Sequence, residues 1–351
     1  MNPVPTIKDV AASARVAPST VSLAFSAPER VAPATRRRVL QAARKLGYVA
    51  NLSASILRSR APGPNALTRK ISIAFLHAQP LRGTILYAAE ARQRALQLGY
   101  GFEQVDLQPL ASRTHLRREL YSRRVAGVLL GPVLDASRLA DLDLSPFCTV
   151  RCGRYELPVR CHLVRPAVVQ TVSAAWKELA SRGYRRIGAA FHRHRPEVPD
   201  DFTREMVVLG CQARYHRNAD HIPILWTTSG EGVGPVEAWF RRHRPDAILH
   251  FASPADDWAY QSGIHIPGEL GLLGLIHPWH PHECAMVEDS AEIARAAVDL
   301  CDQLIRHRQI GEPEVVREIV VPSLWRDGRS LRSAGAGGSS PHARKSAARS
   351  G

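Results

Sequence analysis

The chain of 351 residues is 45% hydrophobic, which is enough for two or three domains with sizeable cores. It contains no apolar run of the roughly 18 residues that a membrane span requires, and its N-terminal residues lack the apolar segment of a secretion signal. Six scattered cysteines without a CxxC pair favour reduced, mostly buried thiols over a disulfide framework. We therefore expect a cytosolic protein with no membrane partner.

The formal net charge of +15 is concentrated at the two ends of the chain. Residues 1–60 hold ten Lys/Arg against two acidic residues, and residues 326–351 hold six against one. A basic head on a nearly neutral body is typical of a protein that binds a polyanion at one end. Plain solubilising charge is the alternative.

The first predicted elements are two short helices in the stretch IKDVAASARVAPSTVSLAF, residues 7–25. The apolar face of the first helix has the i, i+3, i+4, i+7 spacing, at Ile7, Val10, Ala11 and Ala14. Val21 and Phe25 form the face of the second helix, and Val16 lies in the corner between them. This spacing is typical of a helix-turn-helix, whose second helix enters the major groove of DNA.

A third helix is predicted between Pro33, a favourable first-turn residue, and Gly47, a favourable C-terminal cap. Its buried stripe is predicted at Val39, Ala42, Ala43 and Leu46. The arginines expected to point outward, towards phosphates, are Arg36, Arg37, Arg38 and Arg44.

Beyond a Pro/Gly-containing linker the pattern changes to alternating strands and helices. Short apolar runs such as KISIAFLHA, VAGVLLGP, RIGAAFHR and DAILHFA are separated by helical stretches. Such alternation indicates parallel sheets with helices on both faces. We expect two doubly wound α/β lobes with a cleft between them, followed by a low-complexity tail that stays disordered.

The head resembles the LacI/GalR family of bacterial transcription regulators, on TIKDVAASARVAPSTVSLAFS and VAPATRRRVLQAARKLGYVANLSASIL. The body resembles that family's periplasmic-binding-protein-like sensor. The expected domains are a helix-turn-helix head (1–50), a hinge helix (51–60), a linker (61–69), an effector-sensing and dimerisation body (70–326) and a disordered basic tail (327–351).

The resemblance implies DNA-binding roles for particular residues. Pro18, Ser19 and Leu23 would face base edges, whereas Ala54 and Leu57 would enter the minor groove, with Leu57 as a wedge. The positions that match phosphate contacts are Thr6, Ser22, Thr35, Tyr48 and Asn51. The remaining residues assigned to the DNA interface are Thr20, Arg36 and Arg58.

Three residues of the head depart from the family pattern. Ala17 stands where a capping Ser or Thr is usual, and Pro18 partly offsets the missing cap. Arg15 replaces the glycine common at the corner, where a positive φ would cost it more than glycine. Leu23 replaces a frequent arginine and offers only apolar contact, so the operator preference should differ.

In the body the resemblance implies a small ligand, commonly a sugar, between the lobes. Three polar anchors are usual for that ligand, and all three are missing here. Val207 stands at the first, Ile276 and His277 stand at the second, and the CHLVRP stretch has no residue suited to the third. The candidate effector residues at strand ends are His77, Arg82, His192, Ser253, Asp256, Trp258, His277 and Trp279. These side chains favour an acidic or acceptor-rich sugar derivative over a neutral hexose as the ligand. For either Trp, the alternative is that its side chain packs in the hydrophobic core.

The HPWHPHEC segment, with His277, His280, His282 and Cys284, allows a metal interpretation. A polar loop is the default, and we expect no metal and no cofactor. No GxSxG, GxxxxGK[ST] or HExxH pattern indicates an enzyme. We expect a repressor that binds a pseudo-palindromic double-stranded DNA operator as a homodimer, is associated with the bacterial nucleoid when bound, and responds to a sugar-like effector. The alternatives are an effector-independent regulator whose body only dimerises, and an enzyme with a DNA-binding head.

Overall fold

The computed structural model describes residues 6–26, 30–46, 71–78, 82–107, 114–131, 139, 142–153, 157–195, 197–215, 220–276 and 280–333. In these ranges, no helix has both the length and the apolar character needed to cross a membrane. All six cysteines lie in these ranges and are free and buried, as expected.

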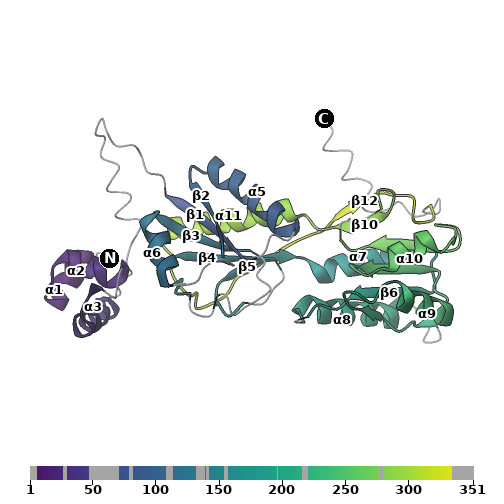
Figure 1. Ribbon diagram of the computed structural model, residues 1–351, viewed down its shortest axis with the longest axis horizontal. Helices are drawn as coiled ribbons and strands as arrows, with labels where there is room; N and C mark the ends of the chain where they lie inside the picture. Colours follow the sequence, from purple (N-terminus) through teal and green to yellow (C-terminus); the bar gives the residue numbers. More distant parts are fainter. Residues whose placement is uncertain are drawn as a thin grey trace. The chain divides into compact units, whose positions relative to one another are not determined.

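The N-terminal head consists of three helices (Figure 1), α1 (Ile7–Ala14), α2 (Pro18–Ser26) and α3 (Pro33–Leu46). They enclose a core of their own, formed by Val10, Ala11, Ala14, Val21, Ala24, Val31, Val39, Ala42 and Ala43. Val16 and Phe25 are partly buried against this core, which agrees with their predicted places. The prediction for Leu46 is wrong, because this last residue of α3 is 37% exposed and does not join the head core.

Two compact units form the rest of the described chain, and neither is continuous in sequence. The N-terminal unit contains residues up to Val164 and then Ser290–Ile319, and the C-terminal unit contains Arg165–Asp289 and the residues from Val320. The chain therefore passes from one unit to the other three times.

A six-stranded sheet forms the centre of the N-terminal unit, in the order β11-β5-β4-β3-β1-β2. Its strands are β1 (Ser72–His77), β2 (Gly101–Asp106), β3 (Val125–Leu130), β4 (Cys148–Cys152), β5 (His162–Pro166) and β11 (Glu318–Val321). β1, β2, β3, β4 and β5 pair in parallel. The helices of this unit are α5 (Arg82–Gln97), α6 (Thr114–Ser122) and α11 (Ser290–His307).

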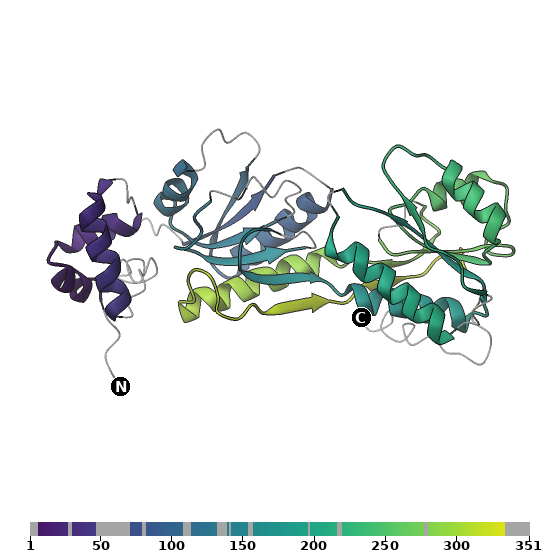
Figure 2. The ribbon, with the colours of Figure 1, turned by 90° about the horizontal axis from the view of Figure 1, so that it is seen from below.

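The helix α11 closes one side of this sheet and lies beside α5 (Figure 2). Its buried residues include Ile293, Ala297 and Cys301. Gly127 of β3 lets this helix come close, because a Cβ there would lie 2.3 Å from the Cys301 sulfur. A polar contact also holds α11, because the hydroxyl of Tyr100, just before β2, donates a 2.7 Å hydrogen bond to Asp302 of this helix.

The C-terminal unit repeats the design with the order β12-β10-β9-β8-β6-β7. Its strands are β6 (Ile187–His192), β7 (Leu225–Thr227), β8 (Ala247–Phe251), β9 (Gly271–Gly274), β10 (Cys284–Val287) and β12 (Leu324–Arg326). Only β12 is antiparallel to its neighbour, β10. The helices are α7 (Val168–Ser181), α8 (Pro199–Tyr215), α9 (Gly234–His243) and α10 (Ala255–Gln261).

The strand order 2-1-3-4-5 within each sheet is a doubly wound arrangement, and the predicted fold class is confirmed. The expected tail boundary differs from the structure. Ser330 and Leu331 are buried, and the Ser330 hydroxyl donates a 2.7 Å hydrogen bond to the Leu272 carbonyl. The body therefore continues to at least residue 333, because Leu331 joins the core of the C-terminal unit.

Candidate DNA-binding surface and effector site

The corner between α1 and α2 has the geometry that a helix-turn-helix requires. Arg15 adopts a left-handed conformation with φ 51° and ψ 54°. The Val16 N–H donates to the Ala11 carbonyl at 3.0 Å, and the Arg15 N–H donates to the Ala12 carbonyl at 3.2 Å. These two bonds form a Schellman motif, in which an apolar residue just after the left-handed position contacts the helix. Val16 is that residue, so the corner directs α2 across α1.

The exposed first turn of α2 is the part of the head that a major groove would meet. Pro18 and Ser19 are exposed, and Thr20 is half-buried. Ala17 has no side-chain oxygen that could cap this helix, as the sequence predicts. The Thr20 N–H donates instead to the Ala17 backbone carbonyl, at 2.9 Å. Leu23 is partly buried against the head core, which leaves only part of its side chain for a base contact.

Thr6 caps α1, a role that the sequence analysis did not assign to it. Its backbone N–H and its hydroxyl both donate to the Asp9 carboxylate, at 2.6 and 2.7 Å. The same two hydrogen bonds lower the pKa of Asp9. Asp9 thus places a carboxylate where a phosphate contact by Thr6 was expected, and the two anions would compete for the same donors.

The third helix contributes a row of exposed cations. Arg36, Arg37 and Arg38 are exposed, and no ion pair joins any of them to another residue that the structure describes. Thr35 and Ser22 are half-buried. Exposed guanidinium groups that form no ion pair with a described residue can bind phosphates.

Several predicted residues lie outside what the structure describes. For the DNA interface these are Tyr48, Asn51, Ala54, Leu57 and Arg58, and for the effector site they are His277 and Trp279. α5 begins at Arg82, but the placement of that side chain is not described.

The remaining effector candidates are divided between the two units. His77 ends β1 in the N-terminal unit, where its Nε2 lies 3.0 Å from Gln104 Nε2 and burial lowers its pKa. Trp258 packs in the core of the C-terminal unit, with its ring 4.7 Å from Phe240. Its indole is therefore a core side chain, the alternative that the sequence left open.

In the C-terminal unit, polar groups gather at the carboxyl ends of β6 and β8, the edge where doubly wound sheets bind ligands. His192 ends β6, and its ring lies 5.4 Å from that of His194. His194 contacts Asp201 of α8, with 2.9 Å between its Nδ1 and a carboxylate oxygen. Arg204 forms an ion pair with Asp201 and stacks over Phe251, with its guanidinium carbon 3.9 Å from the ring centroid.

The Asp201 carboxylate is held ionised by this network. Burial alone would raise its pKa, but hydrogen bonds from the His194 ring and backbone, with the charge of Arg204, lower it to about 2. The sequence analysis missed His194, Asp201 and Arg204. The available signal was the i, i+3 spacing of Asp201 and Arg204 near the start of α8, one turn before Val207.

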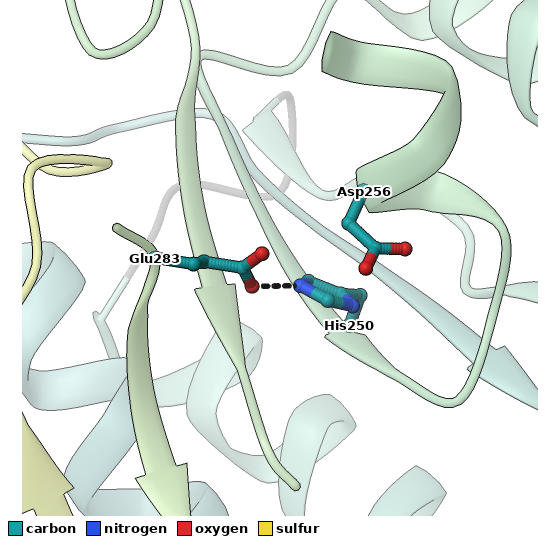
Figure 3. Close-up of side chains that lie close together, drawn as sticks. All are labelled: His250, Asp256 and Glu283. Atoms are coloured by element: carbon teal, nitrogen blue, oxygen red, sulfur yellow. Dashed lines mark hydrogen bonds and ion pairs between the residues drawn. The ribbon is translucent and has the colours of Figure 1, made fainter. Parts of the chain in front are cut away.

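A second polar group lies one strand further along the same sheet (Figure 3). His250 of β8 forms a hydrogen-bonded ion pair with Glu283, which immediately precedes β10. Asp256, in the first turn of α10, lies on the other side of the imidazole ring. Burial would lower the pKa of His250, but the charge and hydrogen bond of Glu283 raise it to about 9. Ser253 is buried nearby in sequence, and among the described residues its hydroxyl has no hydrogen-bond partner.

The described chain thus has a helix-turn-helix head followed by two doubly wound lobes. Residues 6–51 match the family described as bacterial regulatory proteins, lacI family. This match covers the helix-turn-helix head and not the two lobes.

Two curated relatives agree with this assignment. The chain is 33% identical over 186 residues to the maltose regulon regulatory protein MalI of Escherichia coli strain K12, covering 52% of each protein. It is 33% identical over 123 residues to a sucrose operon repressor of Escherichia coli, covering 35% of this chain and 36% of the repressor. The chain thus spans about half the length, or less, of the curated relatives it matches.

Solved structures share the whole fold at low identity. The lac repressor dimer bound to operator and the anti-inducer ONPF is 16% identical with a TM-score of 0.57, over 94% of this chain and 100% of that one. The complex of the transcriptional regulator CelR with cellobiose is 20% identical with a TM-score of 0.56, over 93% and 99%.

Proposed function

We propose that the chain is a sequence-specific DNA-binding repressor that acts as a homodimer on a pseudo-palindromic operator. The observation that carries this proposal is the exposed first turn of α2, set by the Schellman corner at Arg15, on a head whose third helix carries exposed arginines. One head covers a half-site, so a two-fold dimer is needed for a full operator. Regulation of this kind requires no catalytic residue, and we place the protein in the cytoplasm.

Binding should combine a sequence-dependent and a charge-dependent part. The operator is first selected from random DNA with the full chain, and binding is then measured by fluorescence anisotropy. Ser19→Ala should weaken the selected operator more than a scrambled duplex, because base contacts carry the sequence information. Arg37→Gln should weaken both duplexes alike and reduce the salt slope by about 0.9, the value for one phosphate neutralised.

A matched control uses an exposed arginine of the C-terminal unit. Arg241→Gln, on α9 of the C-terminal unit, removes one charge and its ion pair with Glu237. It should leave operator affinity and salt slope unchanged. Equal effects of Arg37→Gln and Arg241→Gln would show that overall charge, and not the head, binds DNA.

We further propose that the C-terminal unit contributes to the recognition of a small acidic or acceptor-rich sugar derivative. The support is chemical: the edge of the sheet at β6 and β8 offers imidazole groups at His192 and His194 and the guanidinium of Arg204. CelR is described with cellobiose and the lac repressor with ONPF, and neither ligand is transferred to this chain. A body that only dimerises is the second candidate, favoured by the apolar residues Val207 and Ile276 at anchor positions.

Thermal-shift measurements on the full chain separate the two candidates. Neutral sugars, sugar acids and sugar phosphates are screened, and a ligand at 100 times its Kd should stabilise the folded state by about 2.7 kcal/mol. A shift with an acidic sugar that Arg204→Gln removes supports the effector. A shift with a neutral hexose, or no shift with any compound, contradicts it.

A further inference from the structure

The buried group of His250, Asp256 and Glu283 contains more negative than positive charge. Asp256 is 1% exposed and Glu283 is fully buried. His250 is the only described cation that forms an ion pair with either carboxylate. Burying a carboxylate is unfavourable unless a cation or several hydrogen-bond donors compensate. One imidazolium therefore balances only one of the two acids.

Two carboxylate oxygens in this group also lack hydrogen bonds. Among the residues that the structure describes, neither Asp256 Oδ2 nor Glu283 Oε2 has a partner, although both atoms are inaccessible to solvent. Each oxygen retains lone pairs directed into the protein. A native fold rarely leaves a buried oxygen without a partner. A carboxylate oxygen that has no hydrogen-bond donor can instead bind a cation.

The three side chains converge at one point. One potential ligand atom from each of His250, Asp256 and Glu283 lies within 4.8 Å of the other two, and Figure 3 shows the imidazole between the two carboxylates. Ligand atoms around a tetrahedral ion with bonds of about 2.1 Å are about 3.4 Å apart. Small side-chain rotations would therefore close the group around one ion.

The backbone keeps this space open at Gly274, the residue of β9 that pairs with His250. A Cβ on Gly274 would lie 3.0 Å from Glu283 Oε1 and 3.5 Å from His250 Nε2. Because β9 lies between β8 and β10, a side chain here would press against the Glu283 carboxylate.

A second group connects the buried one to solvent. Asp256 also lies within 4.8 Å of Asp257 and His280, measured between potential ligand atoms. The side chains of Asp257 and His280 are 57% and 32% exposed, and their nearest charged atoms are 3.6 Å apart. An ion could thus be captured at this rim and passed to the buried ligands through Asp256.

We propose that His250, Asp256 and Glu283 bind a divalent transition-metal ion, with Asp257 and His280 forming its entry. One imidazole nitrogen with two carboxylates suits Zn²⁺ and the neighbouring divalent ions Co²⁺, Ni²⁺ and Cu²⁺. Mg²⁺ and Ca²⁺ prefer ligand sets made only of oxygen. Because an imidazole must give up a proton to bind a metal through the nitrogen that carries it, one proton should be released as the ion enters. This proposal goes beyond the regulatory function and does not depend on it.

Zn²⁺ titration of the chelator-treated full chain, followed by calorimetry, tests the proposal. We expect one Zn²⁺ per chain, no heat with Mg²⁺, and visible Co²⁺ absorption typical of low coordination number. Asp256→Asn should abolish this binding. His280→Gln at the rim and Gly274→Ala beneath the pair should each weaken it about 10-fold or more, as changes around metal ligands commonly do.

The matched control is His282→Gln, which removes an exposed histidine of the same segment and should leave Zn²⁺ affinity unchanged. Circular dichroism checks that each variant is folded. If Asp256→Asn does not fold, His280→Gln and Gly274→Ala decide. Absence of stoichiometric Zn²⁺ binding to the wild-type chain would overturn the proposal. Undiminished Zn²⁺ binding in the folded site variants would also overturn it, as would an equal loss of binding in the control His282→Gln.

Discussion

Replacing Arg15 with glycine should stabilise the head by about 0.5–1 kcal/mol. The left-handed conformation of Arg15, with φ 51°, costs an L-residue about 1–2 kcal/mol. Glycine avoids that strain but loses about 0.5–1 kcal/mol more conformational entropy on folding. Arg15 is exposed and forms no ion pair with another described residue, so no contact is lost. The difference between strain and entropy therefore gives the expected gain.

Hydrogen exchange of the α1 and α2 amides in the full chain measures this effect. Because about 1.4 kcal/mol corresponds to a tenfold change in an equilibrium constant, amides protected by unfolding of the head should exchange about 2–5-fold more slowly. Arg15→Ala is the control, since it removes the same charge but keeps the Cβ that causes the strain. If Arg15→Gly exchanged no more slowly than Arg15→Ala, the strain argument for the corner would be refuted.

Three further predictions concern the C-terminal unit. The folded-state pKa of Asp201 is about 2, below its ordinary value of 3.8. The stabilisation by the ionised carboxylate is therefore present above about pH 4 and is lost as the pH falls towards 2. The difference in unfolding free energy between wild type and Asp201→Asn should shrink by about 2 kcal/mol over that interval. Ala252 has φ 48° and is exposed, so Ala252→Gly should raise the free energy of unfolding by about 0.5–1 kcal/mol in denaturant titrations. Gly271→Ala should lower the free energy of unfolding by about 1–3 kcal/mol, because the new Cβ would lie 2.5 Å from the Tyr184 ring. An unchanged denaturation midpoint would mean that the ring moves away freely.

The sequence predicted elements whose apolar spacing is local. The helix-turn-helix followed from the face formed by Val10, Ala11 and Ala14, and the positive φ at Arg15 agrees with the family departure noted there. Buried parallel strands such as β8 were visible as continuous apolar runs. β11 was not predicted, because its apolar run is only three residues long (319–321) and offers little periodicity to distinguish a strand.

The polar groups were harder to predict because they depend on strand order. His250 lies inside an apolar run and resembles a core residue, and Glu283 is 33 positions away. They meet only because β9 lies between β8 and β10 and carries a glycine at the point of contact. The sequence analysis selected Asp256 as an effector candidate, but it could not select His250 and Glu283, which lie beside it in the fold.

The late return of the chain to the N-terminal unit has a consequence for synthesis. Domains emerge from the ribosome in order and fold as they appear. The sheet of this unit is encoded mainly before Val164, but the helix that covers β3 and β4 is α11, and the edge strand β11 begins at Glu318. The apolar side that α11 will cover must therefore remain exposed while some 120 further residues, those of the C-terminal unit (Arg165–Asp289), are translated. Nascent chains stalled before Ser290 should consequently bind chaperones through that side, and release should coincide with the emergence of α11.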